Sequence, residues 1–115
     1  MEPEEELKKN IKSFCNSAGS VSSAGDYTSA FILYFKALVA LSDLFLLRET
    51  RRVPKDHSDR FAQLQKLDPA LYRTLDKYFH FYRKSYSSSL GKGICDEVGY
   101  YVRFFAKKFK VDLGT

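Results

Sequence analysis

Arg52 and His57, with four residues between them in the stretch RRVPKDHSDRF (51–61), are spaced for chemistry on a phosphate. An arginine can hold two phosphate oxygens, and a histidine can move a proton near neutral pH. If the fold brings both side chains to one phosphate, the pair could cleave RNA without a metal ion. The same two residues could instead be solvated parts of a bend, with His57 helping to start a helix. The sequence leaves both interpretations open.

A second set of candidates consists of cations and a tyrosine near a polar loop. A basic line at helical spacing is formed by Arg73, Lys77, His80 and Lys84. Such a line is either a solvated face or a docking surface for phosphates. Arg83 could hold phosphate oxygens, and Tyr86 could stack on a base or donate its hydroxyl. We therefore take Arg83, Tyr86, Lys84 and His80 as candidate nucleotide- or phosphate-binding residues, with His80 also an alternative catalytic candidate.

A similar basic line occurs near the end of the chain. It consists of Arg103, Lys107 and Lys110, close to Tyr100 and Phe104. The helix dipole favours cations near a helix C-terminus, and we attribute this line to that effect.

Lys36 and Asp43 interrupt the most apolar part of the sequence. Residues 30–47 are apolar except for Lys36, Ser42 and Asp43. At 100° per residue, positions 29, 36, 43 and 50 align, so one polar stripe follows an otherwise apolar helix. Buried charges are costly unless paired, and Lys36 and Asp43 are too far apart to bond directly. We expect each to pair with another helix or subunit, and we hypothesise that Asp43 positions Arg83. The alternative is a thin exposed seam.

The composition indicates one ordinary globular domain over residues 1–115, with a formal net charge of +5. That charge favours nucleic acid, nucleotides or an acidic protein as partners. Cys15 and Cys95 are far apart and belong to no CxxC pair, and with two histidines no metal site is expected. No cofactor is expected either. The acidic start MEPEEELKKN has no apolar signal segment, so we expect a cytoplasmic protein.

Helical spacing of the apolar residues predicts an all-α fold. We expect helices at about 4–23, 26–52, 56 or 58–67, 68–84 and 94–111, with a loop over 85–93. Asp26, Asp68 and either Asp56 or Ser58 are the predicted N-caps, and Pro54 ends the second helix. The predicted architecture is an up-and-down four-helix bundle with one short additional helix.

The second predicted helix is apolar on nearly every side. A membrane span is the alternative, but Lys36 and Asp43 would be costly in lipid. In so small a domain, neighbouring helices could cover one broad face, and the rest would need a second subunit. We therefore expect a homodimer packed along this helix.

Three segments together resemble a known family. They are GDYTSAFILYFKALVALSD (25–43), PKDHS (54–58) and YRKSYS (82–87). They are similar to the HEPN domain, the higher eukaryotes and prokaryotes nucleotide-binding fold, in particular to a small prokaryotic subgroup with a pattern like Arg-x-x-Asp-Tyr. The resemblance spans about residues 7–110. It implies a dimeric helical bundle, often paired with a minimal nucleotidyltransferase in a two-component, toxin–antitoxin-like system. Many family members are RNA-cleaving toxins.

The ribonuclease motif of that family does not fit this sequence at its expected place. In those members Arg-x4-6-His lies near the start of the last long helix, where this chain has Arg83 and no histidine within six residues. Arg52 and His57 have the spacing but follow the second helix, which favours coincidence. A tyrosine, with an ordinary pKa of about 10, does not replace a histidine in proton transfer.

We therefore expect a dimeric HEPN-like module that binds a nucleotide or an RNA phosphate through Arg83 and Tyr86. The first alternative is a metal-independent ribonuclease toxin that uses Arg52 with His57 or His80. The second is a protein-binding scaffold without catalysis.

Overall fold

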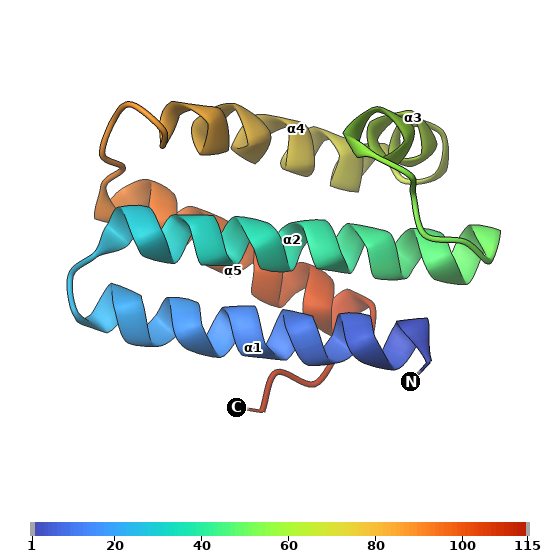
Figure 1. Cartoon of the computed structure of the whole chain (residues 1–115), viewed down its shortest axis with the longest axis horizontal. Coiled ribbons are helices and arrows are strands. Elements are labelled where there is room, and N and C mark those ends of the chain that lie inside the picture. The colour runs from blue at the N-terminus through green and yellow to red at the C-terminus, as the bar shows by residue number, and fades with distance from the viewer. Residues whose placement is uncertain (1, 115) are drawn as a thin grey trace.

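The computed structural model describes residues 2–114, and its regular structure within them is entirely helical (Figure 1). The elements are α1 (Pro3–Ser23), α2 (Tyr27–Thr50), α3 (His57–Leu67), α4 (Pro69–Lys84) and α5 (Lys92–Lys108). The four long helices alternate in direction, and α3 lies crosswise at the connection between α2 and α4 (Figure 1). The predicted all-α fold, a four-helix bundle with one short additional helix, is confirmed.

Aspartates begin three of the helices. The carboxylates of Asp26, Asp56 and Asp68 accept hydrogen bonds from the backbone three residues ahead, at 3.1, 2.8 and 3.1 Å. Each bond satisfies one of the free N–H groups in the first turn. The start of α3 is therefore set by Asp56, one of the two residues that the sequence allowed.

The last helix runs from Lys92 to Lys108, somewhat earlier than the predicted 94–111. It ends because Lys110 takes the left-handed conformation, with a φ of 58°. The Lys110 N–H then bonds the Lys107 carbonyl at 3.1 Å, and the Val111 N–H bonds the Ala106 carbonyl at 2.8 Å. This is the Schellman pattern, which usually has glycine at the left-handed position, so a lysine there gave no signal in the sequence.

The helix α2 is the centre of the core, and α1, α3, α4 and α5 all contact it. It has the length and hydropathy of a membrane span, yet 61% of its most apolar window is buried within the fold. None of the large apolar side chains that remain exposed belongs to α2. One chain therefore buries much of this helix, the α2 face lined by Lys36 stays partly open, and the homodimer expected along it remains a prediction.

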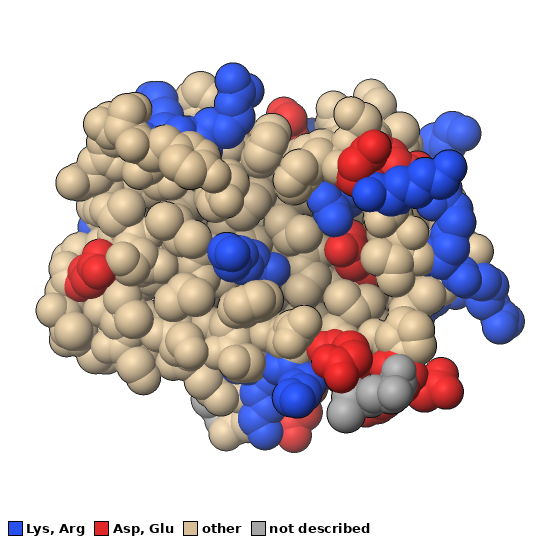
Figure 2. Space-filling view, viewed as in Figure 1, with Lys and Arg blue, Asp and Glu red and all other residues tan. Residues whose placement is uncertain are grey.

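Charge is distributed unevenly over the face on which α1, α2 and α4 lie side by side. Figure 2 shows most of the acidic and basic groups at one end and along the edges, with one basic patch near the middle. Lys36 is the exposed residue in the middle of α2. The polar stripe predicted along this helix thus reaches solvent at one charged side chain.

Candidate functional site

A groove of about 320 Å³ lies over α2, between α1 and α4. Its lining includes Asn10 and Phe14 from α1, Phe35, Lys36 and Asp43 from α2, His57 from α3 and Tyr82 from α4. We call this hollow the α2 groove. It brings together three of the residues singled out in the sequence, namely Lys36, Asp43 and His57, which come from two different helices.

At one end of the α2 groove, Arg60 joins α3 to α2. Its Nε donates to Asp43 Oδ1 at 2.7 Å and its Nη2 donates to Asp43 Oδ2 at 3.1 Å. Both residues are buried, with exposed fractions of 8% for Asp43 and 9% for Arg60. The prediction that Asp43 takes a partner from another helix is right. The hypothesis that this partner is Arg83 is wrong.

His57 is oriented by the same arginine. Arg60 Nη1 lies 2.8 Å from His57 Nδ1. An arginine has no acceptor atom, so Nδ1 accepts this hydrogen bond and the proton of the neutral ring is on Nε2. The arrangement leaves His57 with one N–H donor at the edge of the α2 groove. Because His57 is exposed, that donor is available to a ligand.

The sequence predicts that Lys36, like Asp43, pairs with another helix or subunit, with a thin exposed seam as the alternative. In the fold, Lys36 is exposed, and within residues 2–114 it forms no ion pair. Solvent reaches the middle of α2 through the α2 groove, so the ammonium stays hydrated and needs no acidic partner. Arg60 neutralises Asp43, so the α2 groove carries the uncompensated charge of Lys36.

Aromatic rings form the wall of the α2 groove towards α4. The rings of Phe35 and Tyr82 stack with centroids 4.7 Å apart, and Tyr86 lies edge-on to Tyr82 at 5.6 Å. The Tyr86 hydroxyl donates to the Tyr82 hydroxyl at 3.1 Å. That hydrogen bond, together with burial, raises the pKa of Tyr82, so its phenol stays neutral. With 78% of its surface exposed, Tyr86 has an open face for another ring.

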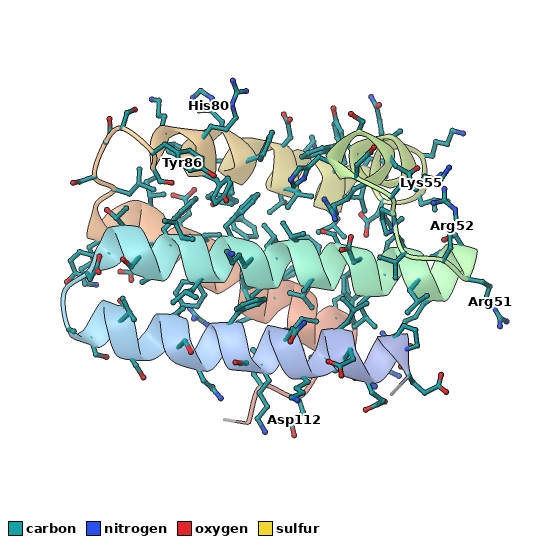
Figure 3. All side chains as sticks on the ribbon, in the orientation of Figure 1. Arg51, Arg52, Lys55, His80, Tyr86 and Asp112 are labelled. Atoms are coloured by element: carbon teal, nitrogen blue, oxygen red, sulfur yellow. The ribbon has the colours of Figure 1, made fainter. Side chains whose placement is uncertain are left out.

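The four residues predicted to bind phosphate or nucleotide separate into two pairs. Arg83 Cζ lies 6.0 Å from the centroid of the Phe79 ring. The centroid of that ring lies 5.4 Å from the centroid of the His57 ring. Tyr86 also lies on the side of α4 nearer α2, whereas His80 is on its outer edge (Figure 3). The His80 ring centroid lies 5.8 Å from that of Phe81, and Lys84 Nζ lies 5.9 Å from the same Phe81 centroid.

Arg83 and Tyr86 therefore lie near the α2 groove, whereas His80 and Lys84 lie away from it. His80, Arg83 and Lys84 belong to α4, whose turn places them on different faces, and Tyr86 lies in the turn just after it.

Arg52 and His57 are not joined in one site. Arg52 donates to both carboxylate oxygens of Asp59, at 2.7 and 3.3 Å, and this pairing holds the pKa of Asp59 well below its usual range. The Lys55 N–H donates to the same carboxylate at 3.0 Å. Arg52 thus helps to fix the turn before α3, at the end of α2 away from the aromatic wall (Figure 3).

Sequence reasoning missed three residues of this region. They are Asn10, Arg60 and Tyr82. The four-residue spacing of Tyr82 and Tyr86 is the signal that was available, although Tyr86 lies in the turn just after α4. The pairing of Arg60 with Asp43 had no such signal, since it depends on the angle at which α3 crosses α2.

Comparison of the chain with known protein families, curated proteins and solved structures finds no match. Within residues 2–114, no three His, Cys, Asp or Glu side chains gather in a way that could hold a metal ion. Function must therefore be argued from the groove itself and from the family resemblance.

Proposed function

We propose that the protein binds a nucleotide, free or as part of an RNA, in the α2 groove. The observation that carries this proposal is an unpaired lysine, Lys36, in the floor of a groove whose wall is aromatic. An ammonium attracts phosphate, and aromatic side chains stack on bases. A volume of about 320 Å³ is at the small end of ligand pockets, which suits a single nucleotide.

Each part of a nucleotide has a partner in this region. Lys36 supplies the charge for the phosphate, and the N–H at His57 Nε2 supplies a directed donor. The exposed ring of Tyr86, held by Tyr82, offers a stacking surface for the base. Arg83, stacked on Phe79 beside His57, adds a second cation at the rim. This assignment keeps Arg83 and Tyr86 from the sequence prediction and adds Lys36 and Tyr82.

The arrangement favours binding over cleavage. The arginines nearest His57 in the sequence are both occupied by carboxylates, Arg52 by Asp59 and Arg60 by Asp43. An arginine held in this way has no free fork for a phosphate undergoing reaction. The ribonuclease alternative would have to use His57 with Lys36 or Arg83.

The test is a titration of the purified protein with AMP and with a short single-stranded RNA, at low and high salt. We expect saturable binding that weakens as salt is raised. Lys36→Gln should weaken it about tenfold, because it removes the charged contact. Lys66→Gln, at an exposed unpaired lysine of α3 that does not line the groove, is the matched control and should bind like the wild type. A wild-type protein that binds neither probe would leave the scaffold alternative.

The same samples test the ribonuclease alternative. RNA that stays intact after incubation with the wild-type protein supports binding alone. Cleavage that His57→Ala abolishes would identify an enzyme instead. The homodimer and the minimal nucleotidyltransferase partner remain proposals that rest on the family resemblance.

A further inference from the structure

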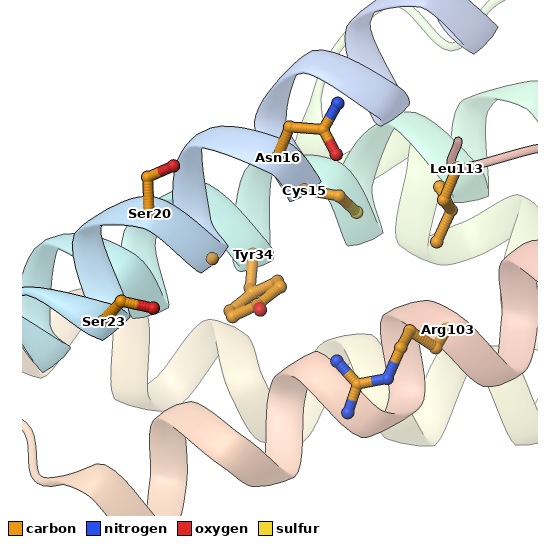
Figure 4. Close-up of a pocket in the computed structure, with 8 residues that line it drawn as sticks. Cys15, Asn16, Ser20, Ser23, Tyr34, Arg103 and Leu113 are labelled. Carbon is orange, nitrogen blue, oxygen red and sulfur yellow. The ribbon is translucent and has the colours of Figure 1, made fainter. Parts of the chain in front are cut away.

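A second hollow, of about 400 Å³, lies on another side of the molecule, between α1, α2 and α5 (Figure 4). We call it the α1–α5 cavity. The polar groups that line it belong to Cys15, Asn16, Ser20, Ser23, Tyr34 and Arg103. Figure 4 shows Ser23, Tyr34 and Arg103 facing the space between three helices, with Leu113 of the C-terminal segment at one end. None of these residues lines the α2 groove.

Arg103 carries the uncompensated charge of the α1–α5 cavity. The cavity has no acidic residue in its lining, and within residues 2–114 Arg103 forms no ion pair. Asp112 and Arg103 share the lining of a neighbouring hollow, where the Asp112 carboxylate accepts a hydrogen bond from the Gly114 N–H at 2.8 Å. The Arg103 guanidinium lies beside Tyr34 and, among the described residues, has no carboxylate partner, so it can hold an anion with two parallel N–H groups.

The two other titratable groups of the cavity are neutral at physiological pH. Burial raises the pKa of the Cys15 thiol to about 11, although Arg103 acts in the opposite direction. Burial also raises the pKa of Tyr34, again with Arg103 opposing it. Cys15 is thus a thiol and not a thiolate, and Tyr34 is a phenol that can donate a hydrogen bond. Neither group neutralises the arginine.

Two glycines shape the α1–α5 cavity. A Cβ at Gly99 would lie 3.1 Å from Tyr34 Cζ and 3.3 Å from Arg103 Nη1, so glycine lets both groups lie close to α5. A Cβ at Gly19 would have no atom within 4 Å, so glycine there leaves part of the space open. The cavity thus results from particular residues on two helices.

We propose that the α1–α5 cavity binds the phosphate monoester of a small organic molecule. The donors favour a phosphoryl group over a carboxylate. The fork of Arg103 and the hydroxyls of Ser23 and Tyr34 come from three helices, and donors that approach from three sides suit the three oxygens of a phosphoryl group better than the two coplanar oxygens of a carboxylate. The volume leaves room for an organic body beside the Tyr34 ring and Leu113. This site is separate from the α2 groove and does not depend on the function proposed there.

The test uses ¹⁵N-labelled full-length protein and amide chemical shifts. The probes are ribose 5-phosphate, inorganic phosphate and, as the neutral control, ribose. We expect ribose 5-phosphate to shift the amides of Gly19, Ser20 and Gly99 saturably, more tightly than inorganic phosphate does, and ribose to shift none. Arg103→Gln should weaken this binding about tenfold. Lys107→Gln, an exposed cation on the same helix, and Lys36→Gln in the α2 groove should not weaken it.

A second variant keeps the proposal testable if the arginine substitution disturbs folding. Gly19→Leu should fill the open space without a clash, raise the melting temperature because leucine favours a helix over glycine, and abolish binding. The proposal is overturned if ribose 5-phosphate causes no saturable shift or binds the Arg103→Gln protein equally well. Equal affinity for inorganic phosphate and ribose 5-phosphate would also overturn it, in favour of a free-phosphate site.

Discussion

The Asp43–Arg60 pair is the most consequential contact between two side chains in the fold. It is bidentate and nearly buried, and it joins the short crosswise helix to the central one. A buried pair of this kind adds little net stability compared with apolar residues of the same size, but it is costly to break on one side. The cost comes from the charge that is left behind without a partner.

We therefore predict different outcomes for single and double substitutions at this pair. Arg60→Met alone should lower the free energy of unfolding by about 3 to 5 kcal/mol, because it leaves the Asp43 carboxylate buried and unpaired. The double variant Asp43→Leu/Arg60→Met should recover most of that loss. Urea denaturation followed by circular dichroism measures both. If the single substitution costs no more than the double one, the pair does not hold α3 in place.

The residue scale is also where sequence reasoning reached its limit. The position of Asp43 among apolar residues correctly indicated that it takes a partner from another helix. The cation that pairs with Asp43 could not be predicted. Arg60 and Arg83 are the same residue type, and only the packing of the helices decides that Arg60 is the one beside Asp43. Periodicity fixes the face of a helix on which a residue lies, and the crossing angle of the neighbouring helix decides what it meets.

Among the elements, the turn between α3 and α4 is the one most dependent on a single side chain. Asp68 ends α3, caps α4 by accepting from the Leu71 N–H, and lies 3.7 Å from the Lys108 ammonium of α5. It is also one of the few buried charged residues, at 9% exposure. Loss of its carboxylate would therefore leave helix-end N–H groups without a partner in a place that water reaches poorly.

We predict that Asp68→Ala lowers the free energy of unfolding by about 1 to 2 kcal/mol, the upper part of the range for an N-cap. Asp76→Ala is the matched control, since Asp76 is an exposed residue of the same helix. It should change stability by less than about 0.5 kcal/mol. Thermal unfolding of the two variants makes the comparison, and equal losses would show that the cap contributes nothing of its own.

Helix boundaries were predictable where a residue type forces them. The three capping aspartates placed the starts of α2, α3 and α4 closely. The exact ends of α2 and α5 were not predictable, because the left-handed residues there are Arg51 and Lys110, and a basic residue in that conformation leaves no mark in the sequence. The four-helix architecture followed from the spacing of apolar residues, whereas the α1–α5 cavity depends on how three helices pack, which periodicity does not give.

At the scale of the whole molecule, the extent to which one chain covers α2 decides whether folding needs a second copy. From the sequence we inferred that one chain could not cover this helix. In the fold, α1, α3, α4 and α5 all contact it, and 61% of its most apolar window is buried. The inference allowed neighbouring helices only one broad face of α2, whereas they contact it from several directions. The α2 groove leaves part of α2 open, so the homodimer stays a prediction.

The proposed homodimer makes a prediction about protein concentration. We expect a higher melting temperature at about 100 than at about 1 µM, because association of folded copies stabilises them by mass action. An unchanged melting temperature would contradict a homodimer in this concentration range and would show that the core of one chain is sufficient. Sedimentation of the same samples gives the stoichiometry.

The hydrogen bond from Arg60 to His57 links the position of this imidazole in the α2 groove to the packing of α3 on α2. His57 reaches the α2 groove only while α3 remains seated on α2, and Arg60 maintains both arrangements at once. When α3 detaches from α2, the His57 imidazole moves out of the α2 groove with it. The nucleotide affinity that we propose for the α2 groove should therefore depend on the local opening equilibrium of the eleven residues of α3.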